Sequence, residues 1–381
     1  MARAPGRSRK QAETVKAVTV EHAPPPVSLA EVLGQARAVG LLREARASGR
    51  VHHAWVFHGP PGVGKFLAAR AFAAELLTPA GTGSEAERVR ELLAAGRHPD
   101  LHIVNKELAS VSSDDRTRRT KQTSIGIEIV REFLVEPAGL APVMEGGGSA
   151  RKVFIVDEAE LLAPGSQDAM LKTLEEPPAG TVVILVTADE HALLPTVRSR
   201  CQRVGFTALE ARAMQAWLEA TPEAPGPGPE RDWLLLHAAG SPGRFLSGVR
   251  NRLFEWQKVI EPMLQNLDRP GGAAPGLGAA MGKLVEERAA AQAAASKFAS
   301  KDTANRHWAG VMLGLVIERA RRRLGAAATP AAARQAVRVI DLVNEAEGQL
   351  DSNVAFVSVL ENLAAQIGEA SLEASAHSDG R

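Results

Sequence analysis

The stretch that ends in Lys65 is the part of the sequence best suited to bind phosphate. Gly59, Gly62, Gly64 and Lys65 satisfy the spacing G-x-x-x-x-G-K, between an apolar run and a helical pattern. The glycines let successive backbone N–H groups and the start of the next helix face phosphate oxygens, and the lysine adds a positive charge. The residues expected to contact a nucleotide in this loop are Gly59, Pro60, Pro61, Gly62, Val63, Gly64, Lys65 and Phe66.

Phe66 departs from this pattern. A Ser or Thr hydroxyl at this position normally ligates Mg²⁺, and a phenyl ring offers no oxygen to a hard cation. We therefore expect ATP to bind weakly or without hydrolysis, Mg²⁺ binding to be impaired, and turnover by the isolated chain to be very slow. Whether the chain is an enzyme stays open, and no metal ligand is assigned.

Three polar residues follow two later apolar runs. Asp157 and Glu158 end the run Val153 to Val156, where such carboxylates hold a metal-bound water and polarise an attacking water. We expect Asp157 to face the metal and Glu158 the water. Thr187 ends the next run, where its hydroxyl would meet the terminal phosphate.

The elements that must position these residues are strands alternating with helices. The apolar runs HAWVFHG, VFIV and TVVILVT are rich in β-branched residues, and helical patterns lie between them. This alternation predicts a parallel sheet covered by helices, with ligands at the carboxyl ends of the strands. After Phe206 the pattern is helical and is broken by two Pro/Gly-rich stretches, which predicts a small helical unit and then a larger bundle.

Length and charge limit the class of protein. The 381 residues suggest two or three domains. Lys and Arg total 45 against 44 for Asp and Glu, so there is no overall field that would attract DNA or a membrane surface. Cys201 is the single cysteine, which excludes a disulfide framework and fits a reducing compartment. With no long apolar segment or signal peptide in the sequence, we expect a cytoplasmic protein without membrane contact.

The sequence resembles a known family over most of the range from Leu33 to Phe245. The segments that carry the resemblance include LGQARAVGLLREARASGRVHHAWVFHGPPGVGK, HPDLHIV, RKVFIVDEAELLAPGSQDAMLKTLEEPPAG, PTVRSRCQ and GSPGRF. These segments are similar to the AAA+ clamp-loader subunits of bacterial DNA polymerase III and, among them, to the delta prime type. The resemblance implies an AAA+ α/β P-loop domain, a small helical lid and an all-α collar.

The resemblance also implies roles for two arginines. Arg200 falls in the family's Ser-Arg-Cys motif, whose arginine reaches the phosphate held by an adjacent ATPase subunit. Arg244 falls where the lid carries a second sensor for the nucleotide of its own subunit. The implied partners are gamma/tau and delta subunits in a hetero-oligomeric ring, the β sliding clamp, and primer-template DNA through the complex. The implied function is ATP-dependent loading of the clamp onto primed DNA during replication.

We expect five segments along the chain. They are a flexible basic tail over residues 1–26, the AAA+ core over 27–207, the lid over 208–250, the helical collar over 251–368 and a disordered tail over 369–381. Relatives commonly carry a four-cysteine zinc module before the strand in HPDLHIV, but this sequence has no cysteine there, so no zinc is expected.

Two alternative functions remain. One is an ATP-hydrolysing subunit of the gamma/tau type whose loop works despite Phe66, and the other is a P-loop kinase for a small molecule. Lys152 and the charged stretch DDRTRRTKQ are further candidates for contact with DNA or a partner.

Overall fold

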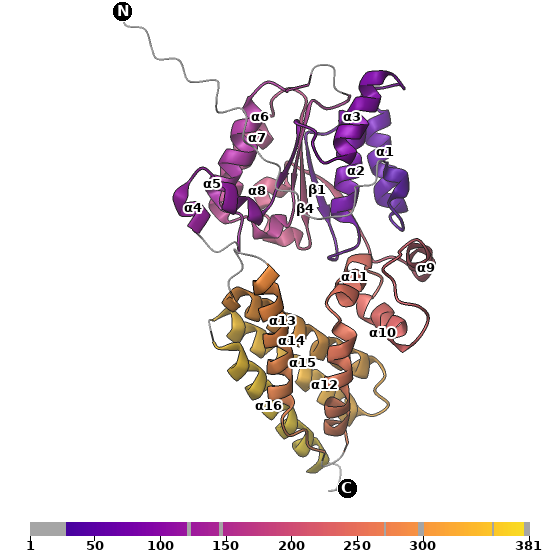
Figure 1. The fold of residues 1–381 in the computed structure, drawn as a ribbon, viewed down its shortest axis with the longest axis vertical. Helices are drawn as coiled ribbons and strands as arrows, with labels where there is room; N and C mark the ends of the chain where they lie inside the picture. The colour runs from indigo at the N-terminus through magenta and orange to yellow at the C-terminus, as the bar shows by residue number, and fades with distance from the viewer. Residues whose placement is uncertain are drawn as a thin grey trace, which may run out of the picture. The chain divides into compact units, whose positions relative to one another are not determined.

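The computed structural model describes residues 28–119, 123–144, 148–269, 272–295, 301–352 and 354–376 (Figure 1). Its contacts divide the chain into two compact units. The first comprises Met1–Ala224 with Ala238–Leu246, and the second comprises Pro225–His237 with Ser247–Arg381. The predicted basic tail, residues 1–26, lies outside the described residues.

The first unit is built on a five-stranded sheet in the order β2-β3-β4-β1-β5, with every pairing parallel. The strands are β1 (Ala54–His58), β2 (Leu101–Val104), β3 (Lys152–Val156), β4 (Thr181–Thr187) and β5 (Gln202–Gly205). Every residue of β3 and β4 is buried, as expected for central strands with helices on both faces. The parallel sheet predicted from the apolar runs is confirmed.

β5 was not predicted from the sequence. Only Val204 of its residues is buried, and the other residues of this short edge strand are exposed. An edge strand of this kind lacks the apolar run by which the other strands were recognised. It is ordered by its hydrogen bonds to β1.

Helices cover both faces of this sheet, with α1, α2 and α3 on one face and α5, α6 and α7 on the other (Figure 1). The helices and turns of this part are η2 (Leu29–Glu31), α1 (Ala36–Ala47), α2 (Lys65–Leu77), α3 (Ser84–Ala94), η3 (Lys106–Val111), α4 (Asp115–Arg119), α5 (Ile127–Val130), the π-helical turn η4 (Arg131–Val135), α6 (Glu136–Gly139), η5 (Ala159–Leu161), α7 (Pro164–Glu175), η6 (Glu190–Ala192), α8 (Pro195–Arg198) and α9 (Ala211–Glu219).

Alternation along β1 explains the two layers. Trp55 and Phe57 point toward α2, where Phe72 meets the Trp55 ring edge-on at 5.4 Å between centroids. Ala54 and Val56 belong to the core cluster on the opposite face. The strand is therefore buried on both faces, and its last residue, His58, leads directly into the glycine-rich loop.

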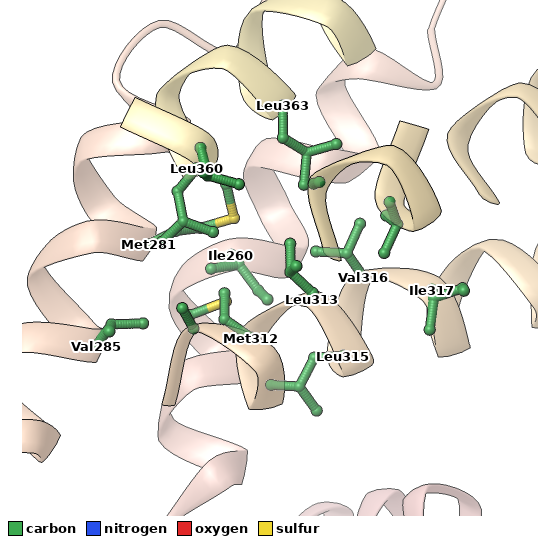
Figure 2. Packing of buried hydrophobic residues seen from close by; sticks show 14 of the residues in the cluster. Ile260, Met281, Val285, Met312, Leu313, Leu315, Val316, Ile317, Leu360 and Leu363 are labelled. Carbon is green, nitrogen blue, oxygen red and sulfur yellow. The ribbon is translucent and has the colours of Figure 1, made fainter. Parts of the chain in front are cut away.

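The remaining helices are α10 (Pro229–Ala238), α11 (Pro242–Arg250), α12 (Leu253–Leu267), α13 (Leu277–Ala295), α14 (Lys301–Gly325), α15 (Pro330–Asp351) and α16 (Phe356–Ala376). Figure 2 shows side chains of α12, α13, α14 and α16 directed into one interior, including Ile260, Met281, Met312 and Leu360. Arg319 is part of this unit and pairs with Glu261 and Asp268. The helical C-terminal region predicted from the sequence is confirmed.

Two predicted boundaries differ from the observed elements. The predicted lid, residues 208–250, is shared between the two units. The predicted disordered tail from residue 369 is corrected, because α16 continues to Ala376. Ser371 is buried there and its hydroxyl donates a hydrogen bond to the Leu267 carbonyl, which ties this last part of the helix to α12. Within the described ranges, none of the helices combines the length and apolarity needed to span a membrane.

Candidate functional site

The glycine-rich loop connects the carboxyl end of β1 to α2, as the motif requires. Gly59, Gly62 and Gly64 have positive φ angles of 136°, 74° and 99°. A Cβ on Gly59 would lie 2.1 Å from the Phe206 carbonyl oxygen, so a side chain cannot be accommodated there. Gly64 is the N-cap of α2, and the loop therefore directs its backbone toward the start of that helix.

Lys65 is buried and turns back onto this loop. Its Nζ donates to the carbonyls of Gly59 and Pro60, each at 2.6 Å. Burial lowers the pKa of Lys65, while the carboxylates of Glu160 and Asp157 oppose that shift. The ammonium group is thus placed beside the loop and near a strand-end carboxylate, and it must exchange carbonyl contacts to reach a phosphate.

The other carbonyls of the loop are also satisfied within this unit. Ser241 Oγ donates to the Pro61 carbonyl at 2.9 Å, and the Gly243 N–H donates to the Gly62 carbonyl at 2.8 Å. Gln35 Nε2 donates to the Val63 carbonyl at 3.2 Å and to the Thr207 carbonyl at 2.8 Å. In each of the bonds to the loop, the loop contributes a carbonyl oxygen, so these contacts hold the loop without using its N–H groups, the groups that bind an anion in such loops.

Phe66 lies in the first turn of α2, where the hydroxyl of a metal ligand would be needed. The Arg70 guanidinium lies 5.8 Å from the centre of its ring, a cation–π contact one turn along the helix. The position supplies a ring and a nearby cation but no oxygen atom. The residues present therefore fit a phosphate better than a phosphate with its Mg²⁺. Within the described ranges, no group of three or more His, Cys, Asp or Glu side chains is placed to hold a metal ion.

Asp157 and Glu158 follow β3, but they are not equivalent. The Glu158 backbone is left-handed, with φ 51°, and its N–H donates to Asp157 Oδ1 at 3.0 Å. Glu158 Oε2 forms an ion pair with Lys106 Nζ at 2.8 Å. Lys106 was not among the residues predicted from the sequence. Of these two carboxylates, Asp157 is the one that raises the pKa of Lys65 against the effect of burial.

Thr187 lies opposite His58 in the β1–β4 register, next to the start of the loop. It is buried, and its hydroxyl donates to the Asp189 carbonyl at 2.8 Å and accepts the Asp189 N–H at 3.0 Å. The hydroxyl is therefore engaged in its own turn.

Arg244 is in the first turns of α11, beside the loop. Its N–H donates to Ser241 Oγ at 3.2 Å, and that hydroxyl also holds the Pro61 carbonyl. A Cβ on Gly62 would lie 3.1 Å from the Arg244 nitrogen, which shows how closely the two backbones approach. Arg244 is half-buried.

Arg200 lies at the opposite end of the strands from the loop, just before edge strand β5 begins. Gln202 is opposite Trp55 in the parallel β1–β5 register, four residues before Gly59, which at about 3.3 Å per residue is a separation of roughly 13 Å along the strand. Arg200 precedes Gln202 and is farther still from the loop. Its Nη2 is 2.6 Å from Glu175 Oε1, and the side chain is 35% exposed. The next residue, Cys201, packs against the core, so the turn is anchored while the guanidinium faces the surface.

The structure also brings together His58, Glu190 and Arg203, which the sequence reasoning did not select. Glu190 forms an ion pair with Arg203, and its Oε2 lies 3.8 Å from His58 Nδ1. Glu190 Oε2 is buried and has no hydrogen-bond partner among the described residues. No sequence motif marks these residues, because their proximity depends on the pairing of β1 with β4 and β5.

Lys152, a candidate for contact with DNA or a partner, is buried and engaged within its own unit. It is 4% exposed, and its Nζ donates to the carbonyls of Pro137 at 2.6 Å and Leu140. The ammonium group caps the end of α6 instead of facing solvent. Of the other candidate stretch, DDRTRRTKQ, residues 120–122 lie outside the described ranges.

Comparisons with known proteins agree with the sequence resemblance. A family described as "DNA polymerase III, delta subunit" matches residues 34–210. The delta' subunit of DNA polymerase III from Pseudomonas aeruginosa is 36% identical over 197 residues, which are 50% of this chain and 53% of that protein. The gamma/tau subunit from Mycobacterium tuberculosis is 34% identical over 204 residues, 53% of this chain and 32% of that protein. A gamma subunit-related protein from Thermotoga maritima aligns with 87% of this chain and 99% of its own at a TM-score of 0.45 and 16% identity.

The family match and the delta' relative confirm the resemblance to delta prime subunits within the matched segment. The chain spans about half the length of the delta' relative and about a third of the gamma/tau relative.

Proposed function

We propose that this chain is a clamp-loader subunit of the delta prime type, because residues 34–210 match the family described as "DNA polymerase III, delta subunit". Its role would be to donate Arg200 to the ATP site of a neighbouring subunit. A guanidinium group stabilises the charge that develops on a transferring phosphoryl group, so its contribution to the rate is large.

The observation that carries this proposal is the placement of Arg200. It lies beyond the amino ends of the strands, whereas the phosphate loop of the same chain follows their carboxyl ends. The side chain is 35% exposed at an anchored turn. An arginine in this position is out of reach of its own loop but accessible to another molecule.

The chain's own loop has a lesser role in this proposal. Gly59 to Lys65 would hold the phosphates of ATP through loop N–H groups and the Lys65 ammonium, with Arg244 as a contact from α11. Asp157 and Thr187 lie at the neighbouring strand ends, and Glu158 is paired with Lys106. With Phe66 in place of a hydroxyl, bound ATP would turn over slowly or not at all.

The partners in this proposal are gamma/tau-type and delta-type subunits in one hetero-oligomeric ring. The complex would close on the β sliding clamp and primer-template DNA when ATP binds. The competing function, an ATP-hydrolysing subunit of the gamma/tau type, is favoured by the intact glycine and lysine spacing of the loop. It differs from the proposal in requiring a competent site around Phe66.

Arg200→Ala tests the proposal directly. The variant is mixed with the gamma/tau-type and delta-type subunits of the same organism, and DNA-stimulated ATP hydrolysis is measured. We expect the rate attributable to the adjoining site to fall at least about tenfold, since arginine fingers contribute 10³ or more. Arg46→Ala is the matched control, because Arg46 is also a partly exposed arginine in an ion pair, with Glu75 at 3.4 Å. An unchanged rate with Arg200→Ala, in a complex that still assembles, would remove the assignment.

A further inference from the structure

Arg200 is already paired with a carboxylate of its own chain. Its Nη2 lies 2.6 Å from Glu175 Oε1, and its Nη1 donates to the Thr196 carbonyl at 2.8 Å. We infer that Glu175 is a positioning residue that holds Arg200 in a paired conformation, from which the phosphate of a neighbouring nucleotide displaces it. This inference rests on the proposed function of Arg200.

The local structure makes the end of α7 a site for a cation. Glu175 is the last residue of α7, and the carboxyl end of a helix carries a partial negative charge. Glu176 follows directly and adds a second carboxylate. The Arg200 guanidinium therefore meets both a full and a partial negative charge, which explains why the side chain turns toward α7.

The backbone elements on both sides of this pair are fixed. α7 packs on the sheet through Met170 and Leu174, both fully or almost fully buried, and the turn after α8 is anchored by buried Val197. Only the two side chains need to rotate for the pair to open. The exchange is therefore a change of side-chain conformation and requires no movement of the sheet.

Glu175 competes with phosphate because both bind the terminal nitrogens of the Arg200 guanidinium group. Strong recognition of phosphate by arginine uses two parallel N–H groups, and here Glu175 and the Thr196 carbonyl each engage one terminal nitrogen. If Glu175 stayed in place, two anions would lie against the same cation and repel each other. Binding of the phosphate thus favours release of Glu175.

The exposure of the pair makes this exchange reversible. The two side chains are 35% and 49% exposed, and ion pairs of this kind add little stability in water. A deeply buried pair would strongly resist opening. The Arg200–Glu175 pair is therefore strong enough to set the conformation of the free subunit and weak enough to yield to a phosphate.

The test uses the full chain in the assembled complex with gamma/tau-type and delta-type subunits. ATP hydrolysis is measured as a function of the concentration of this chain for wild type, Glu175→Gln, Arg200→Ala and the double variant. Glu176→Gln is the matched control, because it removes the same charge from the next residue of the chain. Thermal unfolding of each variant verifies that it is folded.

We expect Glu175→Gln to lower the concentration for half-maximal stimulation by about 1.5- to 5-fold, the range in which exposed ion pairs contribute. Glu176→Gln should change it less, and the gain should shrink at high salt, which screens exposed charges. In the Arg200→Ala background, Glu175→Gln should have no effect.

Two results would overturn the inference while leaving the proposed function intact. One is that Arg200→Ala abolishes stimulation while Glu175→Gln leaves the concentration for half-maximal stimulation unchanged or raises it. The other is a gain from Glu175→Gln that persists without Arg200. If Arg200→Ala leaves stimulation unchanged, the proposed function itself fails, and the inference fails with it.

Discussion

Lys65 and Phe66 are neighbours in the first turn of α2 with opposite consequences for nucleotide chemistry. Lys65 is held beside the loop by two carbonyl contacts and adds a charge near the site of a phosphate. Phe66 offers a ring, with Arg70 over it, where a hydroxyl would meet a metal ion. In the proposed function, the pair would bind phosphate but would not support metal-assisted hydrolysis.

Restoring the hydroxyl tests this view. We expect Phe66→Thr to raise the Mg²⁺-dependent ATPase rate of the isolated chain at least about tenfold, because the new hydroxyl supplies the oxygen that this position lacks for Mg²⁺. The measurement is steady-state phosphate release with and without Mg²⁺. Phe66→Ala is the matched control, since it removes the ring without adding an oxygen.

If wild type already hydrolyses ATP rapidly and Phe66→Thr adds little, the gamma/tau-type alternative is correct. If Phe66→Ala gains as much as Phe66→Thr, the bulk of the ring and not the missing oxygen limits the reaction.

At the level of elements, the start of α11 and the phosphate loop form one packed structure. The Gly243 N–H donates to the Gly62 carbonyl, and a Cβ on Gly243 would lie 2.7 Å from Gly62 Cα. Ser241 completes the contact through the Pro61 carbonyl. The shape of the loop therefore depends on residues far along the chain, since Ser241 and Pro61 are 180 positions apart.

Gly243→Ala should disturb this contact, because the new methyl group meets backbone and not a flexible side chain. We expect a loss of about 1–3 kcal/mol in the free energy of unfolding, typical of overpacking, and weaker binding of a fluorescent ATP analogue. Gly165→Ala in α7 is the control, because a Cβ there meets nothing within 4 Å. Equal stability and equal affinity for both variants would show that the close approach has no energetic role.

At the level of the whole chain, two histidines near the amino end of β2, the buried His98 and the half-buried His102, link stability to pH. His98 is 6% exposed, and His102 stacks on Phe154 at 4.6 Å between ring centres. Burial lowers the pKa of both imidazoles, partly opposed by the carboxylate of Asp100. Between the lowered folded-state pKa and the ordinary value of 6.5, the unfolded chain binds more protons than the folded chain.

Stability should therefore be fully present above the unfolded pKa and decrease as the pH falls below it. We expect a lower free energy of unfolding at pH 5.5 than at pH 7.5, measured by urea titration in the same salt. His102→Phe should reduce this difference, while His191→Gln, at an exposed position, serves as control. A pH difference that His102→Phe leaves unchanged would assign the effect to other groups.

Local patterns in the sequence were sufficient for the phosphate loop, the central strands and the helical character of the C-terminal region. Spacing of glycines and lysine is a local property, and β3 and β4 are buried on both faces, so their apolar runs are unbroken. The edge strand β5 escaped prediction because its burial comes from one residue, Val204. Lys152 stayed a candidate for contact with DNA or a partner until the structure was known, because charge in a sequence does not reveal burial.

The partners of the site residues could not be derived from spacing. Lys106 reaches Glu158, Glu175 reaches Arg200, and Ser241 reaches the loop only after the chain has folded. The distance of Arg200 from the phosphate loop also depends on the strand order, since β1 and β5 are neighbours in space but far apart in the chain. The types and spacing of neighbouring residues determine the phosphate loop and the central strands. The pairing of charges depends on long-range packing, which no local pattern encodes.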